Sequence, residues 1–248
     1  MFGSGQEDGL MRGALQIVLA AAFAGMAACS GPASDGATDS DGPAAEDEAA
    51  AEDDVNIDVW LERMEVGSRE LYSARDAVIA ALDLEAGDVV ADIGAGTGLY
   101  TLLFAEKVGA GGRVYAEDIE PRFLDLINRR AEDSGFDNIT AVLGRENDVT
   151  LPDDAVDVVF IADTYHYFSD REAVMKSVYR ALKPGGSLIL VDYDLKPGET
   201  RPPGKSHVRF GRAGVISEIE YIGFDFAGDR AVEGLEENYF LRFVKADD

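Results

Sequence analysis

The sequence predicts an α/β protein in which helices cover a parallel β-sheet. Stretches that suit buried strands alternate with stretches of helical spacing between residues 89 and 193. Residues 156–162 form an apolar run, as expected of a strand that is buried on both faces. A glycine-rich turn at residues 92–98 joins a strand to a helix, which is where α/β proteins bind ligands.

The elements of the first half follow from periodicity and from helix boundary signals. Apolar residues recur at three- and four-residue steps between residues 59 and 82, which predicts a short helix and a longer one that cover the ligand cleft. Pro121 suits the first turn of a helix, and Gly109 suits a helix end. The elements expected next are a strand at 89–91, a helix at 99–108, a strand at 113–117, a helix at 121–134 and a strand at 139–143.

The second half continues the alternation and then departs from it. After the strand at 156–162, a helix around 174–182 is expected to stop at the sequence Lys-Pro-Gly-Gly of residues 183–186, followed by a strand at 187–193. The remaining expected elements are a helix at 215–222 and strands at 224–232 and 238–245.

The spacing of the glycines in the turn restricts the ligand. Gly94, Gly96 and Gly98 let the backbone bend sharply and approach a ligand where a Cβ would collide. A dinucleotide-binding turn needs a third glycine at position 99, which is Leu99 here. The Gly-Lys-Ser/Thr ending of a phosphate-binding P-loop is also missing.

Four motifs in order resemble those of the class I S-adenosylmethionine-dependent methyltransferases. They are residues 92–98, residues 114–121 with Asp118 twenty residues after Gly98, residues 151–162, and residues 182–186. The resemblance covers most of residues 68–245. It implies a Rossmann-like doubly wound seven-stranded sheet, mostly parallel, with a C-terminal antiparallel hairpin. It also implies S-adenosyl-L-methionine as cofactor.

The resemblance assigns the cofactor-binding residues one by one. Asp118 is expected to accept both ribose hydroxyls, while Glu117 beside it points the other way as a solvated or structural acid. The adenine contact is less determined, with Glu146 preferred and Asn147 or Asp148 as alternatives. The cofactor-binding set expected is Asp92, Gly94, Gly96, Gly98, Asp118, Glu146 and Asp163.

The segment after the fourth strand is where donor and acceptor are expected to meet. His166 suits a general base there, because histidine titrates near neutral pH. The alternative is that His166 only forms the pocket wall. Asp163, Asp192 and Asp194 also fall near strand ends, but without a ligand spacing they are interpreted as solvated acids, and no metal is predicted.

The net charge and the absence of certain motifs restrict the chemical class of the substrate. The formal net charge is −26, with 48 acids against 22 Lys and Arg, which disfavours nucleic acid. No Asn/Asp-Pro-Pro-Tyr/Phe motif follows the fourth strand, and no cysteine of the domain is available as a nucleophile for cytosine methylation. A small molecule, such as a quinone-like or other lipophilic metabolite, fits better.

The N-terminal residues predict export. An uncharged run at residues 14–28 ends at Cys29, the one cysteine of the chain, in a pattern that resembles a bacterial lipoprotein signal. Residues 1–29 are therefore expected to be a signal, residues 30–55 a disordered acidic linker, and residues 56–248 the methyltransferase domain. Lipidation of Cys29 would anchor the protein on the periplasmic side of the cell envelope. An ordinary cleaved signal, an uncleaved anchor and a cytoplasmic protein are the alternatives.

Three functions compete at this point. The leading one is an enzyme that methylates a small molecule. The second is a noncatalytic, envelope-associated nucleoside-binding protein that kept the fold, because an exported enzyme would need a donor made in the cytosol. The third is a dehydrogenase on the same sheet, which the glycine spacing disfavours.

Overall fold

The structure, a computed structural model, describes residues 56–196, 198, 208 and 211–246 of the 248-residue chain. The predicted signal, the predicted linker and Cys29 lie outside these residues. Within them, no helix is long and apolar enough to cross a membrane.

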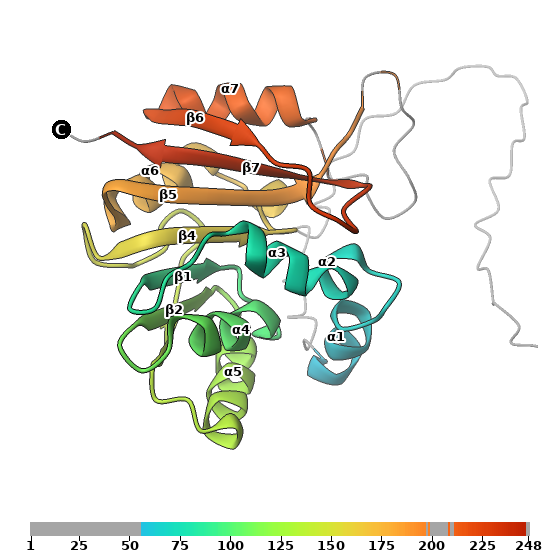
Figure 1. The fold of residues 1–248 in the computed structure, drawn as a ribbon, viewed down its shortest axis with the longest axis vertical. Coiled ribbons are helices and arrows are strands. Elements are labelled where there is room, and N and C mark those ends of the chain that lie inside the picture. The colour runs from blue at the N-terminus through green and yellow to red at the C-terminus, as the bar shows by residue number, and fades with distance from the viewer. Residues whose placement is uncertain (1–55, 197, 199–207, 209–210, 247–248) are drawn as a thin grey trace, which may run out of the picture. The chain divides into compact units, whose positions relative to one another are not determined.

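A seven-stranded sheet runs through the domain in the order β3-β2-β1-β4-β5-β7-β6 (Figure 1). The first five strands are parallel, and β7 is antiparallel to both of its neighbours. The predicted mixed sheet with an antiparallel C-terminal hairpin is thus confirmed. The strands are β1 (Val89–Ile93), β2 (Arg113–Asp118), β3 (Ile139–Leu143), β4 (Val156–Ala162), β5 (Leu182–Tyr193), β6 (Phe224–Asp229) and β7 (Asn238–Lys245).

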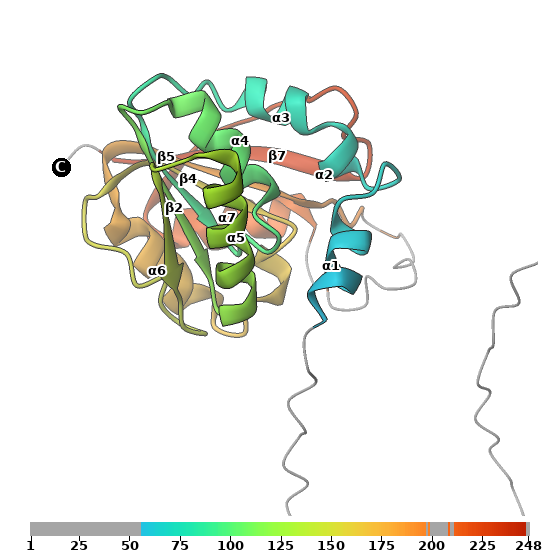
Figure 2. The ribbon, with the colours of Figure 1, turned by 90° about the horizontal axis from the view of Figure 1, so that it is seen from below.

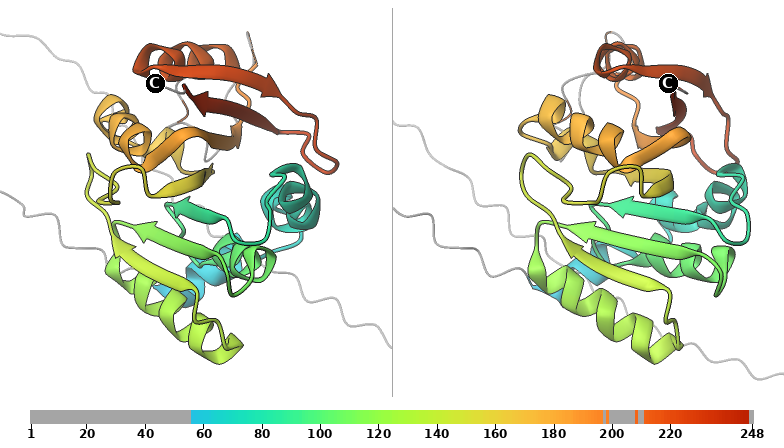
Figure 3. Two further views of the ribbon diagram at one scale, coloured as in Figure 1. Left: turned by 60° about the vertical axis from the view of Figure 1, so that its left-hand side comes forward. Right: turned by 90° about the vertical axis from the view of Figure 1, so that its left-hand side faces the viewer.

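Helices cover both faces of this sheet (Figures 2 and 3). One face packs against α2 (Glu70–Ser73), α3 (Arg75–Ala81), α4 (Leu99–Val108) and α5 (Pro121–Ser134). The other face packs against α6 (Arg171–Ala181) and α7 (Arg212–Ile222). A further helix, α1 (Ile57–Met64), has no buried residue and contacts α5.

The central strand β4 shows why its sequence is apolar. Val158 and Phe160 enter the core beneath α2–α4, whereas Val159 and Ile161 enter the core beneath α6 and α7. Successive side chains of a strand point to opposite faces, and both faces are covered here. Burial of both sets supplies the hydrophobic stabilisation that holds the two helix layers to the sheet.

The largest differences between the observed and the predicted elements lie in three places. The longer N-terminal helix is interrupted at Ala74, giving α2 and α3. The strand β5 begins at Leu182 and so includes the sequence at which the preceding helix was expected to stop. Its pairing with β4 has an irregular register between Val156 and Val158. The strand β6 ends at Asp229, shorter than the predicted 224–232. These boundaries depend on sheet pairing, which helical periodicity and turn residues do not report.

Candidate functional site

The glycine turn bends in a way that only glycine accommodates well. Gly94, Gly96 and Gly98 have φ of 66°, 53° and 78°, in the left-handed region that side chains disfavour. A Cβ on Gly94 would lie 2.3 Å from Thr164 Cγ2, and one on Gly98 would lie 2.7 Å from Ile127 Cγ1. The turn therefore packs tightly against the segment after β4 and against α5.

Two adjacent acids at the end of β2 face this turn. Asp118 Oδ2 accepts from the backbone N–H of Gly96 at 2.9 Å, and Oδ1 accepts from the N–H of Glu120 at 2.9 Å. Glu117 Oε2 accepts from the N–H of Gly94 at 3.3 Å. Both acids line the same cleft. Of the two expectations for Glu117, a solvated acid and a structural acid that point away, the solvated one and the direction were wrong, because its side chain is buried and reaches back to the turn.

Asp92 occupies a different position from the other predicted ligands. Its carboxylate is buried beneath the turn, where the hydroxyl of Thr101 on α4 donates to Oδ2 at 2.6 Å. Asp92 is not among the residues that line the cleft, and neither is Gly98, which precedes the first residue of α4. Asp92 and Gly98 therefore support the turn on the side that faces away from the cleft.

Burial makes this acid cluster reluctant to ionise. The pKa of Asp92 rises to about 7 because its carboxylate is desolvated, although the hydrogen bond from Thr101 opposes the rise. Desolvation likewise raises the pKa of Glu117 to about 8, and the negative charge of Asp118 adds to the effect. The pKa of Asp118 is also raised by burial, against the backbone N–H groups that favour its charged form. A cation bound in the cleft would therefore favour ionisation of these groups.

The segment after β3 contributes Glu146 to the cleft. Arg145 and Glu146 line it, in a tight turn closed by bonding between Arg145 and Asp148. Asp148 is directed elsewhere, because its carboxylate accepts from the N–H of Thr150 and from Arg180. Of the three candidates for the adenine contact, only Glu146 lines the cleft among the described residues, so it remains the predicted contact.

Asp163 ends β4 at the cleft and is held by an arginine from the N-terminal region. Its φ of 50° is unusual for a residue with a side chain. Arg69 Nη2 donates to Asp163 Oδ2 at 2.8 Å, and Arg69 Nη1 donates to the carbonyl of Met64. The sequence indicated a helix over this region but carried no signal for this particular pairing.

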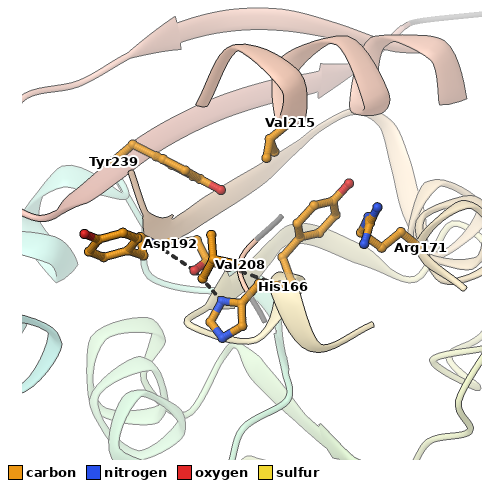
Figure 4. Close-up of a pocket in the computed structure, with 8 residues that line it drawn as sticks. His166, Arg171, Asp192, Val208, Val215 and Tyr239 are labelled. Atoms are coloured by element: carbon orange, nitrogen blue, oxygen red, sulfur yellow. Dashed lines mark hydrogen bonds and ion pairs between the residues drawn. The ribbon is translucent and has the colours of Figure 1, made fainter. Parts of the chain in front are cut away.

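His166 does not line the cleft but is held beside it. It belongs to a short 3₁₀ turn, η1 (Tyr165–Tyr167), and its Nδ1 lies 2.6 Å from Asp192 Oδ1 on β5 (Figure 4). Their side chains are only 6% and 3% exposed. Asp192 was expected to be a solvated acid, which is wrong, because β5 is a central strand that buries it.

The helix α1 forms the outer wall of the cleft, as predicted. The helices α2 and α3, which replace the longer predicted helix, pack against the sheet and do not line the cleft. Trp60 and Met64 line the cleft, and the Trp60 ring meets Phe123 edge-on at 5.9 Å. Glu65, which follows the last residue of α1, pairs with Arg130 on α5. This ion pair fixes the end of α1 to α5. A Cβ on Gly96 would lie 2.8 Å from Met64 Cε, so Met64 lies directly against the turn.

The resulting cleft has a volume of about 470 Å³ and lies at the carboxyl ends of β1, β2 and β4. Its walls are mainly apolar, with polar groups at the turn and at the strand ends. Five of the seven predicted cofactor-binding residues line this cleft. The predicted residues that line it are Gly94, Gly96, Asp118, Glu146 and Asp163.

This fold is that of the class I S-adenosylmethionine-dependent methyltransferases, and residues 91–190 match the sequence model of a methyltransferase domain. Residues 91–190 are thus similar to a methyltransferase domain, and S-adenosylmethionine is the cofactor that such a domain implies. The buried carboxylates at the turn suit the hydroxyls of a nucleoside. The glycines let the protein backbone approach that nucleoside closely.

Particular relatives share part of the chain. It is 29% identical over 139 residues to the ubiquinone/menaquinone biosynthesis C-methyltransferase UbiE of Hydrogenovibrio crunogenus, covering 56% of this chain and 54% of that protein. It is 31% identical over 157 residues to the demethylmenaquinone methyltransferase of Symbiobacterium thermophilum, covering 63% and 59%. The chain therefore spans a little over half the length of these curated relatives.

A solved structure agrees over more of the domain. A SAM-dependent methyltransferase from Aquifex aeolicus superposes with a TM-score of 0.66 at 22% identity, covering 77% of this chain and 99% of that one. At this identity the likeness establishes the fold.

Proposed function

We propose that this protein transfers a methyl group from S-adenosylmethionine to a small lipophilic acceptor. One observation carries the proposal: the glycine turn and the carboxylate of Asp118 meet in a cleft at the carboxyl ends of parallel strands. The sulfonium of the donor supplies an activated methyl group. The main task of the chain is then to bind the donor and to align a nucleophile with it.

The lining residues divide the work of donor binding. We assign the ribose hydroxyls to Asp118, whose two oxygens each keep acceptor capacity beside one backbone N–H. Gly94 and Gly96 allow close approach of the backbone, and we assign the adenine contact to Glu146, which lines the cleft. Asp163 lines the cleft beside the glycine turn, and we assign its carboxylate, held by Arg69, to the donor site as well.

The surroundings favour a lipophilic acceptor. Apolar side chains extend from the cleft to its mouth, where Ile119 and Tyr167 are 58% and 61% exposed. A second hollow of about 390 Å³ adjoins the ion pair of Arg69 with Asp163. Its lining is mainly charged and polar, so it offers space for the polar end of an acceptor. The names of the relatives from Hydrogenovibrio crunogenus and Symbiobacterium thermophilum refer to quinones, which have a hydroxylated ring in the reduced form. The net charge of −26 opposes binding of nucleic acid.

Two measurements test the proposal. Titration calorimetry with S-adenosylhomocysteine reports donor binding, and transfer of tritiated methyl to demethylmenaquinol, the reduced quinone, reports activity. Binding together with transfer supports the proposal. Binding without transfer to demethylmenaquinol or to a panel of small phenols favours the noncatalytic nucleoside-binding protein. No binding of S-adenosylhomocysteine removes the methyltransferase assignment altogether, and binding of a nicotinamide dinucleotide instead would favour a dehydrogenase.

A further inference from the structure

A single buried carboxylate holds both the ring and the backbone of His166. Asp192 Oδ1 lies 2.6 Å from Nδ1 of the imidazole, and Asp192 Oδ2 accepts from the backbone N–H of His166 at 3.3 Å. The backbone N–H of Tyr193 also donates to Asp192 Oδ1 at 2.7 Å. Two backbone N–H groups thus donate to the Asp192 carboxylate, and the imidazole nitrogen Nδ1 lies within hydrogen-bonding distance of it.

We propose that Asp192 is a positioning residue that keeps the proton of neutral His166 on Nδ1, so that Nε2 receives the proton of the methyl acceptor. The proposal rests on the methyl transfer proposed above. An ionised carboxylate only accepts hydrogen bonds, so the ring nitrogen that faces it carries the hydrogen. In a neutral imidazole the other nitrogen then has the lone pair that a base needs. Figure 4 shows that this second nitrogen points away from Asp192.

The place of His166 in the fold brings it to the edge of the cleft. Carboxylate oxygens of Asp163 and Asp192 and a ring nitrogen of His166 all lie within 4.8 Å of one another. Asp163 lines both the cleft and the adjoining hollow. The ring of Tyr167, which also lines the cleft, is centred 4.2 Å from the imidazole. The imidazole thus lies directly behind Asp163 and Tyr167, two residues that line the cleft.

Two carboxylates and an imidazole could also bind a divalent cation. The guanidinium of Arg69 already contributes a positive charge 2.8 Å from Asp163. A divalent cation would have to displace this pair, and the direct contact between His166 and Asp192 leaves the two groups bonded to each other. The geometry therefore favours a base with its orienting carboxylate.

Several charged and titratable groups surround the pair of His166 and Asp192. Arg171 and Tyr239 line the small cavity that His166 and Asp192 share, and they come from α6 and β7. The groups that face the pair from the packed elements are Arg69, Asp163, Tyr165, Tyr167, Arg171, Tyr193 and Tyr239.

For a hydroxylated acceptor, methyl transfer begins with removal of the hydroxyl proton. Nε2 of His166 takes the hydroxyl proton, and the acceptor oxygen, or the ring carbon conjugated with it, bonds to the methyl carbon. The bond between that carbon and sulfur breaks, its electron pair stays on sulfur, and the product is S-adenosylhomocysteine. Transfer to carbon is completed when the ring carbon gives up its proton and the acceptor oxygen takes one up from solvent, which restores the hydroxyl. The imidazolium finally releases its proton to solvent, and Asp192 stabilises it in the meantime.

Nuclear magnetic resonance of the histidine side chains tests the tautomer without any acceptor. The chain contains only two histidines, so His166→Gln assigns the signals. In protein labelled with ¹⁵N-histidine, we expect the neutral His166 ring to carry hydrogen on Nδ1 and none on Nε2. In Asp192→Asn, we expect the hydrogen on Nε2 in a large share of molecules, because the amide can present an N–H to Nδ1. A wild-type ring with hydrogen on Nε2 would overturn the proposal.

Kinetics separate positioning from a merely structural role. With demethylmenaquinol as acceptor, we expect Asp192→Asn to lower kcat by about 10²-fold or more, with the acceptor KM changed by less than about threefold. S-adenosylhomocysteine affinity should stay within about twofold. The fall of wild-type kcat at acidic pH should be absent in His166→Gln and should move to lower pH in Asp192→Asn. Asp194→Asn, which removes a neighbouring carboxylate paired with Arg212 rather than His166, serves as the matched control.

The outcomes distinguish the two proposals. Unchanged kcat and an unchanged pH profile in Asp192→Asn would overturn the positioning role, even if the wild-type tautomer is as expected. A wild type that binds S-adenosylhomocysteine but methylates nothing would overturn the proposed function, while the tautomer measurement would still decide the assignment of Nδ1. A stimulation of transfer by Mn²⁺ that is lost in His166→Gln would favour the metal site and contradict the base.

Discussion

The guanidinium of Arg69 lies 2.8 Å from the carboxylate of Asp163, across 94 residues of sequence. The two side chains are 23% and 17% exposed, so water screens the pair only in part. The pair stands between the cleft that we assign to the donor and the hollow that we assign to the acceptor.

Arg69→Ala should destabilise the protein and weaken donor binding together. The substitution leaves the carboxylate of Asp163 partly buried without its positive partner, which costs about 1–3 kcal/mol of unfolding free energy. Urea denaturation measures this loss, and calorimetry with S-adenosylhomocysteine measures the affinity. Arg129→Ala, an exposed arginine on α5, is the control and should change neither. Equal behaviour of the two variants would contradict the role of the pair.

Asp118→Ala should weaken the binding of S-adenosylhomocysteine by about 1–3 kcal/mol, because buried ribose hydroxyls would lose their partner. Titration calorimetry on the folded variant measures the effect. Asp125→Ala removes an exposed carboxylate from the neighbouring helix and should bind as the wild type does. Unchanged affinity in Asp118→Ala would sink the ribose assignment.

Gly96→Val should abolish donor binding. Its Cβ would lie 2.8 Å from Met64 Cε, and its branched side chain would occupy the space where the backbone meets the donor. The φ of 53° adds backbone strain. Gly111→Ala, where the nearest atom to the added Cβ is 3.9 Å away, provides a tolerated glycine substitution for comparison. Retained binding of S-adenosylhomocysteine in a folded Gly96→Val protein would argue against the turn as the donor site.

The stability of the donor-free protein should fall as pH rises from about 4 to about 8. Burial raises the pKa of Asp92 from 3.8 to about 7 and that of Glu117 from 4.5 to about 8. Over this range the folded state binds more protons than the unfolded state, so the unfolding free energy decreases with pH. Glu117→Gln removes one of these groups and keeps an acceptor for the N–H of Gly94.

Urea denaturation at several pH values measures this dependence. The Glu117→Gln variant should show a shallower slope and should exceed the wild type in stability near pH 8. Glu106→Gln on the exposed face of α4 is the matched control and should leave the slope unchanged. Parallel curves for the wild type and Glu117→Gln would contradict a raised pKa at this position.

Lipidation at Cys29 is a prediction from sequence alone, since the residue lies outside the described part of the chain. Metabolic labelling with a fatty-acid probe should mark the full-length protein in a bacterial host, and Cys29→Ser should lose the label. A labelled serine variant, or an unlabelled wild type in the soluble fraction, would remove the envelope localisation and strengthen the cytoplasmic alternative.

The motifs at the strand ends could be predicted because local chemistry determines them. Positive φ at Gly94, Gly96 and Gly98 requires glycine, and a strand buried on both faces requires the apolar run at 156–162. These constraints act over a few neighbouring residues, so periodicity and spacing express them directly. The order of the four motifs extended this information to the sheet topology.

The partners of individual side chains could not be predicted in this way. Arg69 with Asp163 and His166 with Asp192 join residues that are 94 and 26 positions apart, and nothing local distinguishes these acids from exposed ones. The same holds for Glu117, which turned out to be buried beside the turn.

The sequence by itself determined the α/β alternation, the glycine turn and the placement of Asp118 at a strand end, because each depends on backbone conformation or on the period of the chain. Only the tertiary structure decided which carboxylates are buried, which of the predicted residues line the cleft, and that His166 is oriented by Asp192. The physical reason is that burial and pairing depend on which segments meet through sheet register and helix packing. Residues far apart in sequence then supply the groups that raise the pKa of a carboxylate or orient the His166 imidazole.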